Sequence, residues 1–147
     1  MRQAAEGVEY VEEDPGGGTT LEIRAKRAVE RDAKVLGFFR TPLRREVALE
    51  AVSVRLRSRT ITLEASARRG TFSPGRGAVR LAGQVSVRVD GMAAEPEEAL
   101  IGRSGDVAFR GRVWVPRKGR GLAVEEGYAG PVDGLAAWLR AAAGGEK

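Results

Sequence analysis

The sequence predicts an all-β fold, an antiparallel open β-jellyroll with a V shape, and one C-terminal α-helix. Three observations predict it. Apolar and charged residues alternate with a period of two over most of the chain, short glycine-containing turns separate these stretches, and one strand phrase recurs three times. A period of two directs apolar side chains to one face of a strand and charged ones to the other. Short connections favour antiparallel strands over strands joined by crossover helices.

The recurring phrase begins at Val47 (VALEAVSVRL), at Val79 (VRLAGQVSVRV) and at Val107 (VAFRGRVWV). A second phrase, TLEIRA from Thr20, recurs as TITLEA from Thr60. The repeating unit is therefore a pair of antiparallel strands. The first copy lacks the residue that stands as Gln84 in the second, which predicts a bulge or bend near Ala51. Glycines at equivalent mid-strand positions, Gly83 and Gly111, predict corners where long strands fold over.

The two ends of the chain differ from the repeats. Residues 1–18 form an acidic segment with one possible strand at 7–13, residues 19–130 form the jellyroll domain, and residues 131–147 form a helix and tail. The helix is predicted from Leu135, Trp138, Leu139 and Ala142 at helical spacing, with Asp133 as N-cap and Gly144 as the stop. Trp138 and Leu139 are interpreted as a plug over one end of the apolar interior, in preference to a stripe that docks a partner.

Residues 91–102 allow two interpretations, because Pro96 interrupts them. They hold either a short helix or a loop leading into a strand at 99–101. Turns are expected at four places, residues 73–75, 90–91, 103–106 and 118–121.

The composition argues against an enzyme. The chain has no cysteine, histidine or asparagine, so it lacks the imidazole base, the thiolate nucleophile and the usual zinc ligands. Adjacent carboxylates such as Glu97 and Glu98 point in opposite directions in an extended chain. No glycine stretch has the form of a phosphate-binding loop. We therefore expect no catalytic residues, no metal site and no cofactor.

The formal net charge is +5, from 25 Lys and Arg against 20 Asp and Glu. A modest affinity for polyanions is compatible with this charge, although an ordinary solvated surface gives the same count. Aromatic residues make up only 5% of the chain, too few for a platform on which nucleic-acid bases stack. We expect no nucleic-acid partner. An apolar run long enough to span a membrane or to act as a signal peptide is not found in the sequence.

The paired phrases TITLEASARRGTF and GAVRLAGQVSVRV resemble the lipopolysaccharide-export family of periplasmic proteins, of the LptC and LptA type, and the LptC type more closely. In this family a strand of the form L-x-A-x-x-A passes into one of the form V-x-L-x-G-x-V-x-V. The resemblance spans roughly residues 7–130, and residues matching the motif are Leu63, Ala65, Val79, Leu81, Gly83, Val85 and Val87. The C-terminal helix and the lack of an anchor before Gly7 depart from the family.

The resemblance implies a lipid-binding, non-enzymatic component of lipopolysaccharide transport. Acyl chains would lie in an apolar groove, while outward arginines such as Arg80, Arg88, Arg110 and Arg112 would meet lipid A phosphates. Its partners would be the inner-membrane ABC transporter for lipopolysaccharide and an LptA-like bridge protein, which pairs with the open edge of the sheet. The expected location is the periplasm, with an inner-membrane anchor in a segment that this sequence does not include.

The groove is assigned to apolar residues on the inward faces of the strands. These are Leu21, Ile23, Leu49, Ile61, Leu63, Val79, Leu81, Val85, Val87, Phe109, Val113 and Val115. Small residues on the same expected face leave room either for acyl chains or for close packing of the sheets, namely Ala25, Ala51, Ala65, Ala67, Gly83 and Gly111. The alternative function is a structural or scaffold module that assembles through its sheet edges without a ligand, and a dry, fully packed interior would favour it.

Overall fold

The computed structural model describes residues 3–32, 45–116 and 122–142. In these ranges all strands join one antiparallel sheet in the order β1-β2-β3-β4-β5-β7-β8-β10, with β6 between β4 and β7 and β9 paired to β8. The elements are β1 (Gln3–Glu13), β2 (Thr20–Asp32), β3 (Arg45–Arg57), β4 (Thr62–Ser73), β5 (Ala78–Ala82), β6 (Ser86–Val89), β7 (Met92–Gly102), β8 (Asp106–Pro116), β9 (Leu122–Glu125), β10 (Ala129–Pro131) and α1 (Val132–Ala142). The prediction of an antiparallel all-β fold with one C-terminal helix is confirmed.

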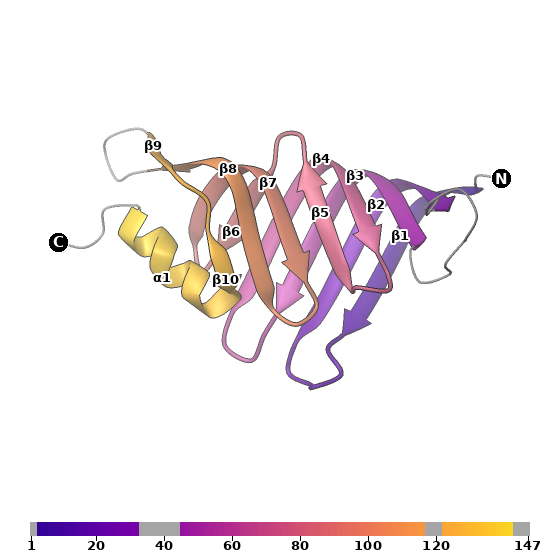
Figure 1. Ribbon diagram of the computed structural model, residues 1–147, viewed down its shortest axis with the longest axis horizontal. Coiled ribbons are helices and arrows are strands. Elements are labelled where there is room, and N and C mark those ends of the chain that lie inside the picture. Colours follow the sequence, from indigo (N-terminus) through magenta and orange to yellow (C-terminus); the bar gives the residue numbers. More distant parts are fainter. Residues whose placement is uncertain (1–2, 33–44, 117–121, 143–147) are drawn as a thin grey trace, which may run out of the picture.

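The long strands bend over along one row that crosses the sheet. In this row the backbone has a positive φ at Gly7 (62°), Ala51 (54°), Gly83 (81°) and Gly111 (79°). The strand register aligns them, since Gly7 and Ala51 both lie level with Lys26 of the intervening strand. The left-handed conformation turns the chain sharply, and it recurs on every second strand. The sheet therefore folds over along the upper edge in Figure 1 and forms two layers.

The bend row divides each long strand between the layers. The first layer contains β6, β9 and the segments 8–13, 20–25, 52–57, 62–67, 92–96 and 113–116. The second layer contains β5, β10 and the segments 3–6, 27–32, 45–50, 69–73, 98–102 and 106–110. The free ends of the strands form a rim along the lower side of the molecule in Figure 1, opposite the bend.

The alternation of buried and exposed residues changes phase at the bend. Two consecutive residues face outward at Lys26–Arg27, at Glu50–Ala51 and at Arg68–Arg69, and strict alternation resumes on either side. This phase change keeps the apolar face inward in both layers. The irregularity predicted at Ala51 is therefore a bend, and it inserts no residue, because the pairing of β3 with β4 keeps its register across it.

The structure extends two strands beyond their predicted bounds, and the helix or loop expected before residue 99 is wrong. Residues 92–102 form the continuous strand β7 and not a helix or loop, because Ala94, Pro96 and Ala99 point inward among outward glutamates. The register between β7 and β8 shifts between Pro96 and Glu98, and such a bulge tolerates a residue without an N–H. The strand predicted at 7–13 is present and is longer than predicted, since β1 pairs with β2 from Gln3 to Glu13.

The predicted turns at 73–75, 90–91 and 103–106 join consecutive strands, and the fourth, at 118–121, lies outside the described residues. At Asp90–Gly91 both residues have a positive φ, as a two-residue hairpin requires. Helix α1 begins at Val132, so Asp133 is its second residue and not its N-cap. The Asp133 carboxylate instead accepts a hydrogen bond from Thr60. The predicted stop, Gly144, is outside the described part of the chain.

Candidate functional site

The residues predicted to line a groove come together between the two layers. Eleven of the twelve side chains are 0–3% exposed and belong to one apolar cluster: Leu21, Ile23, Leu49, Leu63, Val79, Leu81, Val85, Val87, Phe109, Val113 and Val115. Ile61 lies in the turn before β4, where it is half-buried and packs against this cluster. In the described residues no polar or charged residue is buried. The buried part of the space between the layers is therefore lined by apolar groups.

The chain's own side chains fill this space. A side chain that is 0–3% exposed is already in contact with its neighbours on all sides. Ala25, Ala65 and Ala67 face inward and bring the layers close together. Three small residues that were expected to leave room inside do not line the interior, because Ala51, Gly83 and Gly111 lie in the bend row.

At the β1 end side chains of the two layers are in contact. Half-buried Tyr10, in the first layer, packs its ring against buried Phe72 of the second layer, with centroids 4.9 Å apart. Burial raises the pKa of the Tyr10 hydroxyl, and the nearby Glu30 carboxylate raises it further. Next to this pair, Arg103 Nη1 lies 3.0 Å from Glu12 Oε1, so an ion pair also joins the rims of the two layers.

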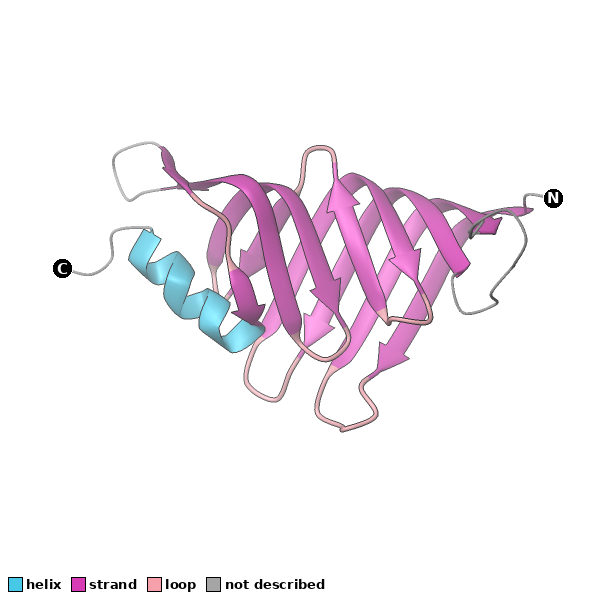
Figure 2. Cartoon of the chain, viewed as in Figure 1, coloured by secondary structure: helices cyan, strands magenta, loops and turns pink. Residues whose placement is uncertain are grey.

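Helix α1 closes the other part of the rim. It packs against β7, β8 and β10 and buries Val132, Leu135, Ala136, Leu139 and Ala142, four of which join the apolar cluster. Half-buried Trp138 lies with its ring centroid 6.1 Å from Phe109 and 5.7 Å from Tyr128. These contacts support the interpretation of Leu139 and Trp138 as a plug. Figure 2 shows the helix immediately after β10, at the lower rim of the sheet.

Sequence reasoning missed the polar contacts that hold this helix in place. Thr60 Oγ1 donates a hydrogen bond to Asp133 Oδ1 at 3.2 Å, and Arg140 Nη2 donates to Asp90 Oδ2 at 3.0 Å. Thr60 and Asp90 stand in turns at the rim of the first layer, far from the helix in the sequence. The helical spacing revealed the apolar face of α1, but no local pattern indicated which turns would meet its polar face.

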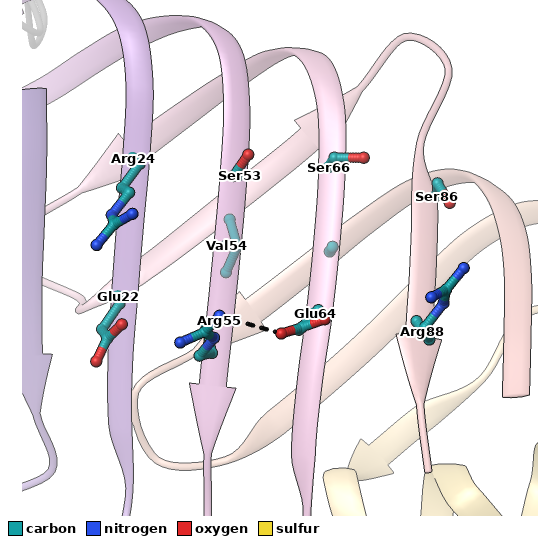
Figure 3. A pocket seen from close by; sticks show the side chains of 10 residues that line it. Glu22, Arg24, Ser53, Val54, Arg55, Glu64, Ser66, Ser86 and Arg88 are labelled. Carbon is teal, nitrogen blue, oxygen red and sulfur yellow. Dashed lines mark ion pairs between the residues drawn. The ribbon is translucent and has the colours of Figure 1, made fainter. Parts of the chain in front are cut away.

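A polar hollow of about 400 Å³ lies on the outer face of the first layer (Figure 3). Its floor is a row of serines in direct register across three strands, Ser53, Ser66 and Ser86. Longer side chains wall it, among them Arg55, whose Nη2 lies 3.2 Å from Glu64 Oε2. A sequence signal for it exists, since VSVR occurs twice and places Ser53 and Ser86 at the same position of the repeat. Its charged walls are exposed, and we assign it no chemistry.

The outward arginines lie where the sequence predicts. Arg80, Arg88, Arg110 and Arg112 are exposed on the outer faces of the layers. Their guanidinium groups are therefore accessible to phosphate or carboxylate groups from solution.

The described residues include no helix with the length and apolar character needed to cross a membrane. No protein-family model matches the sequence, and a search of curated proteins returns no match. The relation to the lipopolysaccharide-export family therefore stays a prediction from the strand motifs.

Proposed function

We propose that this chain is a non-enzymatic, periplasmic component of lipopolysaccharide transport that holds acyl chains between the two layers of its folded sheet. It receives the lipid from an inner-membrane ABC transporter and passes it to an LptA-like bridge protein. The observation that carries the proposal is the interior, which is lined from β2 to β8 by apolar side chains and, among the described residues, buries no polar or charged group.

Acyl chains suit such an interior because they need only apolar contact. Each methylene that leaves water contributes about 0.8 kcal/mol, so a long acyl chain gains free energy in an apolar space. Leu81 and Val85 stand on either side of the bend at Gly83, where the layers meet. Acyl chains between the layers would lie against both residues.

The exposed arginines fit the polar part of the same ligand. Arg80 and Arg110 lie on the outer face of the second layer. Arg88 lies on the outer face of the first layer, and Arg112 lies next to the bend at Gly111. Guanidinium groups bind phosphate through paired hydrogen bonds. The lipid A phosphates would stay in water and contact these side chains.

Strand β1 supports transfer to a partner. It has eleven residues, and within the described ranges it pairs with β2 alone. A strand of this length at the edge of a sheet offers backbone groups to the strand of another protein. The opposite end is less suitable, because β9 has four residues, β10 has three, and Pro131 has no N–H to donate.

Site-specific photo-crosslinking tests the lipid-binding function. A photoreactive residue replaces Leu81 or Val85 in the interior, and Arg80 on the outer face serves as the matched control in the same strand as Leu81. We expect purified lipopolysaccharide to be labelled from Leu81 and Val85 and much less from Arg80. Labelling confined to Arg80 would rule out the proposal.

A scaffold module is the second candidate, because the interior is already filled and β1 is a long edge. This function needs no ligand and predicts self-association or edge pairing in lipid-free buffer. Sedimentation velocity of the delipidated protein separates the two candidates. Concentration-dependent assembly without lipid, combined with no labelling from Leu81, would favour the scaffold.

A further inference from the structure

Helix α1 bridges the rims of the two layers. Its first turn contacts the turn between β3 and β4 through Asp133 and Thr60, and its last turn contacts the turn between β6 and β7 through Arg140 and Asp90. Both turns belong to the first layer. The helix packs at the same time against β8 and β10, whose paired segment belongs to the second layer.

The two attachments differ in kind. On the second layer the helix continues directly from β10, Val132 N donates to Gly105 O at 2.8 Å, and Phe109 N donates to Tyr128 O at 2.7 Å. On the first layer the polar contacts of Asp133 and Arg140 use exposed side chains, and those of Arg140 and Asp90 are 61% and 53% accessible to solvent. Exposed ion pairs contribute little stability. The polar attachment of the helix is therefore stronger on the second layer than on the first, where buried apolar contacts hold the helix.

Tyr128 holds the segment that joins β10 to α1. Tyr128 Oη donates a hydrogen bond to Pro131 O at 2.7 Å, and its ring lies against Trp138 of the helix. Gly130 and Gly134 lie so close to the Tyr128 hydroxyl that a Cβ at either position would be 2.9 or 2.6 Å from it. Tyr128 thus packs against both the end of β10 and the start of the helix.

The apolar face of α1 occupies part of the interior. Leu135 and Leu139 are fully buried, Val132 is 2% exposed, and all three belong to the same cluster as the predicted groove residues. We propose that α1 is a lid that fills the acyl-chain site from the rim and must swing away from the first layer, about the β10–α1 junction, when lipid enters. This inference rests on the proposed lipid-binding function. It explains how an interior that is filled without ligand admits acyl chains.

The experiment crosslinks helix α1 to the first layer. Because the chain has no cysteine, a Thr60→Cys/Asp133→Cys variant carries the only two thiols, at positions whose oxygen atoms now lie 3.2 Å apart. A short bis-methanethiosulfonate reagent joins them, and dithiothreitol releases them. An Asp90→Cys/Arg140→Cys variant, joined by a longer reagent of the same kind, locks the other end and keeps Asp133. The control is Ser53→Cys/Ser66→Cys, which links two strands already paired on the outer face.

Two measurements are made on each protein, binding of purified lipopolysaccharide and hydrogen exchange of the α1 amides. We expect each lock on the lid to weaken lipid binding by about tenfold or more, because the open state is then removed from the population, and we expect reduction to restore it. The control link leaves binding unchanged. Without lipid, α1 amides exchange faster than those of β3 and β4, and lipid accelerates only α1.

If the crosslinked and reduced proteins bind lipopolysaccharide with equal affinity, the proposal that α1 is a lid is wrong. It is also wrong if the α1 amides exchange as slowly as those of β3 and β4. If the wild-type chain binds no lipopolysaccharide, the proposed function fails, and the exchange rates of α1 still decide whether the helix opens independently.

Discussion

Tyr10 and Phe72 join the two layers of the sheet at the β1 end. Their ring centroids are 4.9 Å apart and their planes are inclined by 40°. Phe72 is 1% exposed, whereas Tyr10 is half-buried at the rim. This contact connects the edge strand to the apolar interior, so it contributes both to stability and to the closed state of the rim.

We predict that this ring contact is energetically coupled. In a double-mutant cycle of Tyr10→Leu and Phe72→Leu, the coupling energy should be about 0.5–1.5 kcal/mol, the range for aromatic pairs beyond their buried area. Urea unfolding of the four proteins measures it. If the two single effects add within error, the rings do not interact in solution as they do in this structure.

Ala51, in the bend row, has a φ of 54°, which is unfavourable for a residue with a Cβ and lowers the free energy of unfolding. Ala51→Gly should therefore raise the free energy of unfolding by about 0.5–1 kcal/mol. Ala48 in the same strand has no positive φ, so Ala48→Gly is the matched control and should lower it by a similar amount, about 0.5–1 kcal/mol. Destabilisation by both substitutions would contradict the bend at Ala51.

Gly111 is required at the opposite end of the same row. Its φ is 79°, and a Cβ there would collide with the side chain of Glu97 on the neighbouring strand. Gly111→Ala should lower the free energy of unfolding by about 1–3 kcal/mol. Gly16→Ala is the control, since its nearest contact would be Asp14 at 3.4 Å and no positive φ is needed. If the two variants have the same melting temperature, the left-handed bend at Gly111 is contradicted.

The attachment of α1 should weaken in alkaline solution. Burial raises the pKa of Tyr128 above its ordinary value of 10.0, and the Asp133 carboxylate adds to the shift. The folded protein thus binds this proton more tightly than the unfolded chain. Its contribution to stability is complete below pH 10 and is lost as the pH rises through the pKa of the folded state. The ionised oxygen also no longer donates to Pro131 O.

Tyr128→Phe provides the control for this pH dependence. Trp138 fluorescence, recorded in a Trp114→Phe background, should change above pH 10 in the protein with Tyr128 and much less in the protein with phenylalanine. Equal changes in both would assign the effect to another group, for example Tyr10, whose pKa is also raised.

The strand pattern was sufficient to predict most of the fold. Alternation predicted the inward faces of β2 to β6, and the missing residue near Ala51 predicted a bend that the structure places in one row with Gly83 and Gly111. Pro96 misled the prediction for β7, because a proline in a strand is tolerated at a bulge, and the bulge depends on the register with β8. The acidic composition of residues 1–18 concealed only the first residues of β1, which begins at Gln3 and not at Gly7. Glu6, Glu9 and Glu13 are exposed, whereas Glu12 is half-buried and pairs with Arg103.

The candidate site was predicted less completely. The lining residues converge because each was chosen by its inward position in a strand, a local property. Whether the layers touch or stand apart depends on how far the bend closes, and the contacts Tyr10–Phe72 and Glu12–Arg103 that bring the rims together connect residues 62 and 91 positions apart. The position of α1 over the rim depends likewise on Thr60 and Asp90, which its own sequence does not specify.

The central claim is that acyl chains lie between the two layers. Methyl-labelled protein, mixed with lipopolysaccharide in solution, tests it through nuclear Overhauser effects between acyl-chain protons and assigned methyl groups. The account predicts contacts to the buried methyls of Leu63, Leu81 and Val87, and none to the exposed methyls of Val11, Leu122 and Val124, which are 55–58% accessible. Contacts confined to Val11, Leu122 and Val124, with the interior methyls unchanged, would contradict it.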